Sequence, residues 1–132
     1  MNSTDSGTER CRALRRALLD LHRALIDLER RSYEKQWGAQ SAGDFLQVVA
    51  FSDEMRWLEP LTRLIVMLDE AIDADSPDVT QAVVTTRIRE VLNLDRSRTD
   101  EFSVRYLAHF DASPDLAAAH AKLLAALKPG AS

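Results

Sequence analysis

A heptad pattern of apolar residues between Thr8 and Gly38 constrains the fold of this chain more than any other feature. Its members recur at alternating steps of three and four residues: Cys11, Leu14, Leu18, Leu21, Leu25 and Leu28. That spacing aligns them along one face of an α-helix. At a rise of about 1.5 Å per residue, the stretch predicts a helix on the order of 45 Å long.

The apolar surface of this predicted helix is wider than a coiled-coil seam. Leu19 and Ile26 extend it on one side, and Ala17 and Ala24 extend it on the other. Such a wide arc is typical of a helix inside a bundle, where alanines let a neighbour approach closely. The remaining face predicts surface salt bridges between an acidic and a basic row. These rows are Asp20, Asp27 and Glu34, and Arg16, Arg23 and Arg30.

Turn and capping residues divide the next part of the chain. Gly38 is expected to end the first helix, and Ser41 is expected to cap a short second helix. That second helix is crowded with apolar residues over 45–51, which predicts a buried connector. Pro60 fits best in a first turn, so we expect a third helix from about Leu58, with Asp53–Trp57 as a separate turn before it.

Three further helices are predicted in the second half of the chain. The string Ser76-Pro77-Asp78 is a helix start, and it introduces the helix of residues 79–92. This stretch is rich in Val and Thr, but its apolar residues keep helical spacing. Thr99 is expected to cap the next helix, and Ser113-Pro114-Asp115 repeats the start signal for the last one.

Together these elements predict an all-α protein. Its architecture is an up-and-down bundle of about six helical segments organised around the long N-terminal helix. A chain of 132 residues suits one domain with a single core, which we place at residues 9–128. Residues 1–8 and 129–132 are expected to be disordered tails.

Composition points to a cytoplasmic protein that does not span a membrane. The chain has a single cysteine, which excludes an internal disulfide and fits a reducing compartment. No run of about 18 apolar residues and no apolar leader is present. The net charge of −4 argues against a nucleic-acid partner.

The predicted length of the first helix raises the question of what covers it. A globule of this size is on the order of 35 Å across, which is shorter than the helix. Either shorter helices of the same chain lie end to end along it, or a second copy of the chain packs there in a two-fold dimer. The wide apolar arc favours the homodimer.

Several strings in the chain resemble a family of small bacterial all-helical proteins of uncharacterised function. They are Leu21-His22-Arg23-Ala24-Leu25-Ile26-Asp27 with Glu29-Arg30, Trp57-Leu58-Glu59-Pro60-Leu61, and Ala119-His120-Ala121. The similarity extends from about Leu14 to Leu127. It implies a helical fold and carries no catalytic motif, so no site residue is transferred from the family.

His22 is the first candidate for chemistry because it lies at the edge of the apolar arc. One interpretation is a structural histidine that is hydrogen-bonded to a carboxylate of Asp69 or Glu70. The alternative is a metal or small-ligand site built from His22, Glu29, Asp69 and Glu70. The sequence favours the first interpretation and predicts no metal or cofactor. It lacks the Glu-x-x-His pair of carboxylate bundles, and His109 and His120 have no paired spacing.

Other candidate residues are weaker. Cys11 is expected to be buried, and Trp37 and Trp57 are expected to fill the edge of the core. A basic cluster, Arg10, Arg12, Arg15 and Arg16, allows contact with an anionic surface such as nucleic acid. No phosphate-binding glycine loop and no nucleophile elbow is present.

The leading hypothesis is therefore a non-enzymatic protein that associates with itself or with another protein. Its predicted interaction face is the leucine stripe: Leu14, Leu18, Leu21, Leu25 and Leu28. The first alternative is a metal- or ligand-binding bundle, and possible enzyme, centred on His22. The second is a regulator that binds nucleic acid weakly through the N-terminal arginines.

Overall fold

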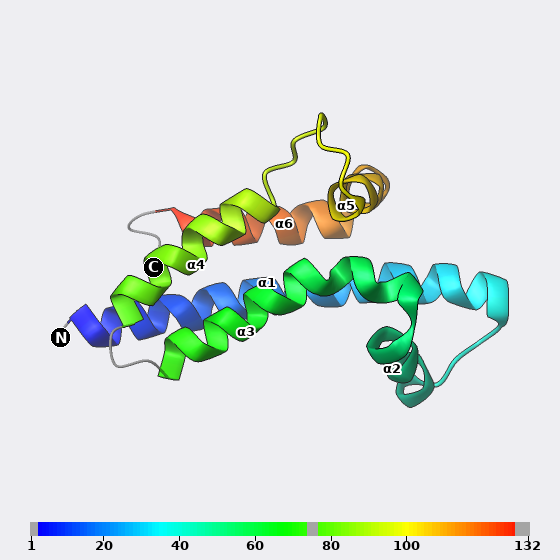
Figure 1. The fold of residues 1–132 in the computed structure, drawn as a ribbon, viewed down its shortest axis with the longest axis horizontal. Helices are drawn as coiled ribbons and strands as arrows, with labels where there is room; N and C mark the ends of the chain where they lie inside the picture. The colour runs from blue at the N-terminus through cyan, green and yellow to red at the C-terminus, as the bar shows by residue number, and fades with distance from the viewer. Residues whose placement is uncertain (1–2, 74–76, 129–132) are drawn as a thin grey trace.

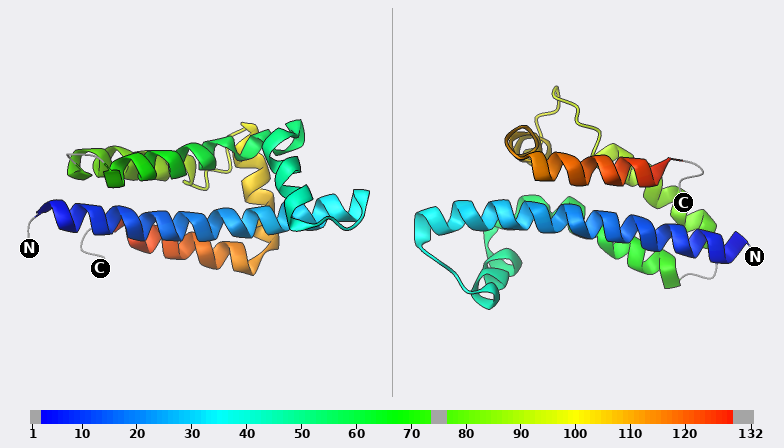
Figure 2. Two further views of the ribbon diagram at one scale, coloured as in Figure 1. Left: turned by 90° about the horizontal axis from the view of Figure 1, so that it is seen from below. Right: turned by 180° about the vertical axis from the view of Figure 1, so that it is seen from behind.

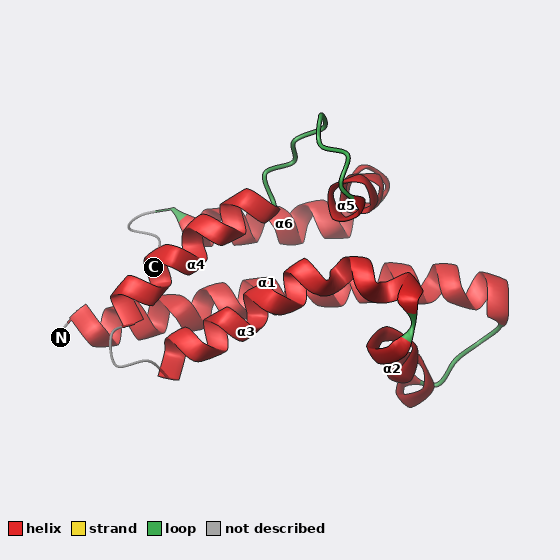
Figure 3. Ribbon diagram, in the orientation of Figure 1, coloured by secondary structure: helices red, strands yellow, loops and turns green. Residues whose placement is uncertain are grey.

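The computed structural model describes residues 3–73 and 77–128, and these residues form helices joined by short loops (Figure 1, Figure 3). The elements are α1 (Ser3–Trp37), α2 (Ala42–Phe51), the 3-10 helix η1 (Asp53–Leu58), α3 (Glu59–Asp73), α4 (Pro77–Val91), α5 (Glu101–Ala112) and α6 (Pro114–Leu127). No strand occurs in the described part of the chain. The predicted all-α fold is confirmed.

Four of the helices run alternately up and down. Helices α3 and α6 are antiparallel to α1, and α4 is parallel to it (Figure 1, Figure 2). The short helices α2 and α5 cross the bundle near the end where α1 finishes (Figure 2). The predicted up-and-down bundle around a long N-terminal helix is therefore the observed architecture.

The apolar arc of α1 is covered by the chain itself. Helices α3, α4 and α6 all pack against α1. The last turns of α1 project past these helices, and α2 lies beside them (Figure 2). Of the two ways of covering the long helix, the structure shows shorter helices of the same chain.

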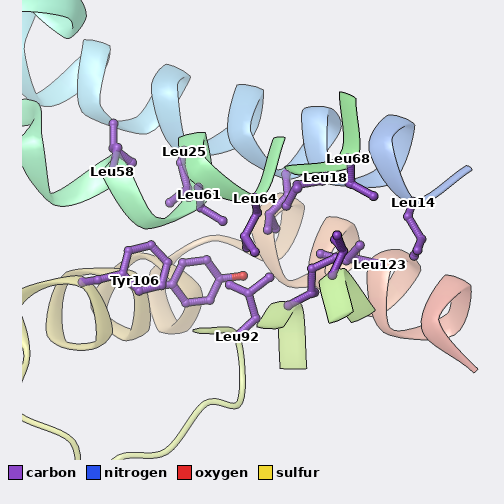
Figure 4. Close-up of a cluster of buried hydrophobic side chains, with 14 of the residues drawn as sticks. Leu14, Leu18, Leu25, Leu58, Leu61, Leu64, Leu68, Leu92, Tyr106 and Leu123 are labelled. Carbon is purple, nitrogen blue, oxygen red and sulfur yellow. The ribbon is translucent and has the colours of Figure 1, made fainter. Parts of the chain in front are cut away.

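The core lies between the four long helices, and Figure 4 shows leucines of α1, α3 and α6 directed into it together with Tyr106 of α5. Leu14, Leu18, Leu21 and Leu25 are fully buried, and Leu28 packs against the core partly buried. The leucine stripe is thus an internal surface. This corrects the expectation that it is an interaction face, because intramolecular partners already exclude it from other molecules.

Several helix ends follow the predicted capping residues. Gly38 adopts the left-handed φ of +88° and donates its N–H to the Glu34 carbonyl at 2.8 Å. The side chains of Ser41 and Ser113 accept from backbone N–H groups in the first turns of α2 and α6. The turn before Pro60 is the 3-10 helix η1, and the Val- and Thr-rich stretch is helix α4.

Two predicted helix starts differ from the structure. Helix α1 begins at Ser3, ahead of the expected start at residue 9, because adding turns to an existing helix costs little. Helix α5 is capped by Asp100 instead of Thr99. An ionised carboxylate is a stronger acceptor than a hydroxyl near the positive end of a helix. Ser76 and the predicted tail residues 1–2 and 129–132 lie outside the described residues.

Candidate functional site

The structure separates the four residues of the predicted metal or ligand site. Asp69 pairs with Arg15, whose Nε lies 2.5 Å from its Oδ1. Glu29 pairs with His109 on α5. Within the described ranges, no group of three His, Cys, Asp or Glu side chains is placed to hold a metal ion. Glu70 is exposed on α3.

His22 is half-buried on α1, and this partial burial lowers its pKa below the ordinary value. The expected hydrogen bond to Asp69 or Glu70 is not formed. Asp69 is occupied by Arg15, and His22 makes no side-chain hydrogen bond to any described residue. The histidine is therefore a neutral side chain at the edge of the core.

A histidine–carboxylate pair that the sequence did not reveal joins α5 to α1. His109 Nε2 lies 2.9 Å from Glu29 Oε1, and the two side chains are 21% and 12% exposed. The His109 ring stacks on Trp57 of η1 at a centroid distance of 5.9 Å. The Arg105 guanidinium lies over the same indole ring at 5.8 Å. These contacts fasten α5 and η1 to the last third of α1.

A second pair joins α5 to α6 inside the core. Tyr106 Oη lies 2.5 Å from His120 Nδ1, and both residues are 2% exposed. Burial raises the pKa of Tyr106 and lowers the pKa of His120. The tyrosine therefore stays protonated, and its hydroxyl shares one hydrogen bond with Nδ1 of a neutral imidazole, whose tautomer sets which group donates. His120 Nε2 is buried and has no hydrogen-bond partner among the described residues.

Access to both pairs from outside the protein is restricted. A general base must reach a proton on a substrate, and the Tyr106–His120 pair is enclosed by Phe110 and other core side chains. The Glu29–His109 pair is covered on one side by Trp57. Both pairs act as polar links between helices.

Two arginines of the predicted basic cluster make contacts within the protein. Arg10 donates to the carbonyl oxygens of Leu127 and Lys128 at the end of α6, at 2.8 and 3.1 Å. A guanidinium there satisfies carbonyls that the helix leaves unpaired. Arg15 is fixed by Asp69. Arg12 and Arg16 are exposed and make no ion pair within the described part of the chain.

The predicted salt-bridge rows along α1 form in part. Arg30 and Glu34 approach to 3.7 Å, and Glu34 also accepts from the backbone N–H of Gln40 at 2.6 Å. The other predicted pairs of the rows do not form among the described residues. Most of these arginines therefore lie in solvent without a fixed partner.

Three exposed apolar side chains lie on the last turn of α1 and on α2. Trp37, Leu46 and Phe51 are 59%, 63% and 80% exposed. Of the α2 residues, Phe45 alone is fully covered, where its ring meets Tyr33 edge-on at 5.8 Å. The predicted buried connector is thus wrong for most of α2. We call Trp37, Leu46 and Phe51 the apolar end.

A shallow groove of about 490 Å³ adjoins Phe51. Its walls come from the end of α2, from η1 and from the first turn of α3, and its apolar lining includes Val49, Met55 and Leu58. Two charged residues, Arg56 and Glu59, lie on its border. The apolar end therefore carries a projecting aromatic ring beside an apolar hollow.

A sequence signal for the apolar end exists, since α2 has apolar residues on all sides of a single helix. From the sequence alone, apolar residues on all sides of a helix predict complete burial. Only the lengths and positions of the neighbouring helices show that part of α2 is left exposed. The Glu29–His109 pair has no comparable signal, because its residues are 80 positions apart.

Comparison with protein-family models, with curated proteins and with solved structures finds no match to this chain. The resemblance to a family of small bacterial helical proteins therefore stays a prediction. Within the described ranges, no helix is long and apolar enough to cross a membrane.

Proposed function

We propose that this protein is a non-enzymatic, cytoplasmic interaction module that forms a homodimer through its apolar end. The observation that carries the proposal is the 80% exposure of Phe51 beside an apolar groove of about 490 Å³. An exposed aromatic ring beside an apolar hollow is a feature of surfaces that bind other proteins.

The partner that best fits this surface is a second copy of the chain. A two-fold interface uses the same patch on both subunits, so the patch must complement itself. Here one patch contains both the projecting ring of Phe51 and the hollow beside it. In a two-fold pair, each phenylalanine enters the groove of the other copy.

The charges around the groove are also self-complementary. Arg56 and Glu59 both border it, and they have opposite signs. The Arg56–Asp53 ion pair is 78% and 86% exposed by side chain, so its partners exchange easily for groups on another molecule. A two-fold contact offers each arginine a carboxylate of the other copy.

The other function classes have less support. Of the residues of the His22-centred site, Asp69 pairs with Arg15 and Glu29 pairs with His109, so the structure does not bring the four side chains together. Arg10 and Arg15 are engaged within the fold, and the carboxylates of Asp69 and Asp73 line the groove beside Arg12 and Arg16, which disfavours a nucleic-acid backbone there. The cytoplasmic placement rests on the single cysteine, Cys11, which is fully buried.

Gel filtration with light scattering over a micromolar concentration series tests the proposal. The wild type is expected at about twice the chain mass of 14.8 kDa. The variant Phe51→Ser is expected at the monomer mass with an unchanged thermal unfolding midpoint, because an exposed ring contributes little to folding. Val104→Ser provides the control, since Val104 is 53% exposed on α5, outside the apolar end.

Two results would contradict the proposal. One is a wild type that stays monomeric at every concentration. The other is a dimer that Phe51→Ser leaves intact, which would place the interface elsewhere.

A further inference from the structure

A second groove, of about 480 Å³, lies between α1 and α3 near the start of α1, away from the apolar end. Its α1 wall carries three guanidinium groups, and its α3 wall carries two carboxylates. The lining residues are Arg12, Arg15, Arg16 and Leu19 from α1, and Asp69, Ile72 and Asp73 from α3.

One of the three guanidinium groups is already neutralised. Arg15 Nε donates to Asp69 Oδ1 at 2.5 Å, which bridges the two walls of the groove. The side chains of both residues are less than half exposed, at 41% and 48%. Arg15 is therefore committed to Asp69.

The other two guanidinium groups are not paired with a described carboxylate, although Asp73 lines the same groove. Arg12 and Arg16 are one helical turn apart, and neither makes an ion pair with a described residue. Like charges at this spacing repel each other and destabilise a helix by a few tenths of a kcal/mol. An anion seated between them removes that repulsion. The planar fork of arginine also matches the geometry of phosphate oxygens.

We propose that this groove binds a small phosphate monoester, with Arg12 and Arg16 holding its phosphate. The opposite wall selects the rest of the ligand. Asp73 makes no ion pair within the described ranges, so its carboxylate is available to accept from a hydroxyl group. Leu19 and Ile72 supply an apolar surface beneath the ligand. The ligand class is a phosphorylated small molecule that carries hydroxyl groups.

The same features disfavour a long polyanion. Asp69 and Asp73 line the groove, and the chain as a whole has a net charge of −4. Successive phosphates of a nucleic acid would meet these carboxylates. A single phosphate that contacts only the α1 wall avoids them.

Isothermal titration calorimetry at low salt, with inorganic phosphate and glycerol 3-phosphate as probes, tests the proposal. We expect saturable binding with Kd on the order of 1 mM, and tighter binding of the hydroxyl-bearing probe. Arg12→Gln and Arg16→Gln are each expected to weaken binding about tenfold. Arg23→Gln is the matched control, because Arg23 is an exposed α1 arginine that does not line the groove.

Three outcomes would overturn the proposal: no saturable binding of either probe, equal affinity in all the arginine variants, or binding of duplex DNA alone. Circular dichroism of each variant confirms the fold. The dimer test on Phe51 uses a different surface, so failure of one proposal leaves the other unaffected.

Discussion

At the scale of single residues, two polar pairs decide how α5 is held in the molecule. Glu29–His109 links it to α1, and Tyr106–His120 links it to α6. A buried polar group that loses its partner costs more than the hydrogen bond gained in forming the pair. These pairs therefore restrict α5 to one orientation more strongly than apolar packing alone.

Removing the Tyr106 hydroxyl tests the buried pair. Tyr106→Phe leaves His120 Nδ1 without a partner in the core, so we expect the free energy of unfolding to fall by about 1–3 kcal/mol. Urea unfolding followed by circular dichroism measures the change. Tyr33→Phe is the control, because the Tyr33 hydroxyl makes no hydrogen bond to a described residue, and its loss should change stability by less than about 0.5 kcal/mol.

The buried histidines predict how stability depends on pH. Burial lowers the pKa of His22 and of His120 below the ordinary value of 6.5. The unfolded chain therefore binds protons at these rings more readily than the folded protein. The free energy of unfolding is therefore expected to be highest at pH values above the unfolded pKa. It should decrease as the pH falls from the unfolded pKa toward the lower pKa values of the folded state.

Urea unfolding at a series of pH values checks this prediction. The double variant His22→Gln/His120→Gln should show a shallower fall in stability than the wild type, with His109 retained in both proteins. His120 faces Tyr106 and Phe110 and no charged side chain in the described contacts. An equally steep fall in the double variant would assign the pH dependence to other groups.

At the scale of elements, helix ends are fixed by local backbone chemistry. Gly38 ends α1 in the left-handed conformation, and its N–H satisfies a carbonyl of the last turn. Arg30 then donates to the Gln40 carbonyl in the following loop at 2.5 Å. Together these contacts turn the chain sharply toward α2.

Two glycines provide a matched test of this conformation. Adding a Cβ at Gly38 or at Gly43 meets no atom within 4 Å, so backbone conformation alone separates the two positions. Gly38→Ala is expected to destabilise the protein by about 1–2 kcal/mol because of its positive φ. Gly43→Ala lies within α2 and is expected to stabilise it by about 0.5 kcal/mol. Thermal unfolding of both variants measures the difference. A shift of the unfolding midpoint in the same direction for both variants would contradict the expectation.

At the scale of the whole molecule, burial separates leucines that the sequence presents as similar. Leu18 is fully buried between helices, whereas Leu46 is 63% exposed at the apolar end. Leu18→Ala should lower the free energy of unfolding by about 2–5 kcal/mol. Leu46→Ala should change it by less than about 0.5 kcal/mol at low protein concentration, where the proposed dimer is dissociated. An equal decrease in the free energy of unfolding for the two variants would indicate that Leu46 is buried in the core.

The helices themselves follow from patterns that lie close together in the sequence. The heptad from Cys11 to Leu28 predicts the buried face of α1, and that face is buried. Serine caps and Gly38 predict helix ends to within a residue or two. Each of these depends on interactions within a few residues, which a sequence displays directly.

The choice of partner for each face came from tertiary structure. Whether the leucine stripe packs against another chain or against this one depends on how α3, α4 and α6 pack along α1. The heptad spacing is the same for an intramolecular and for an intermolecular partner, so it cannot distinguish them. Likewise, Asp69 pairs with Arg15 instead of His22, and Glu29 with a histidine 80 residues away. Such pairings depend on the relative rotation and offset of whole helices.

The sequence by itself determined that the chain is helical, where most helices begin and end, and which side of α1 is apolar, because helical periodicity and capping are local. The tertiary structure decided that the apolar side is internal, that α2 leaves Leu46 and Phe51 exposed, and that Arg12 and Arg16 line a groove between α1 and α3. The reason is that exposure and pairing are properties of packed elements, and packing depends on contacts between residues far apart in the chain.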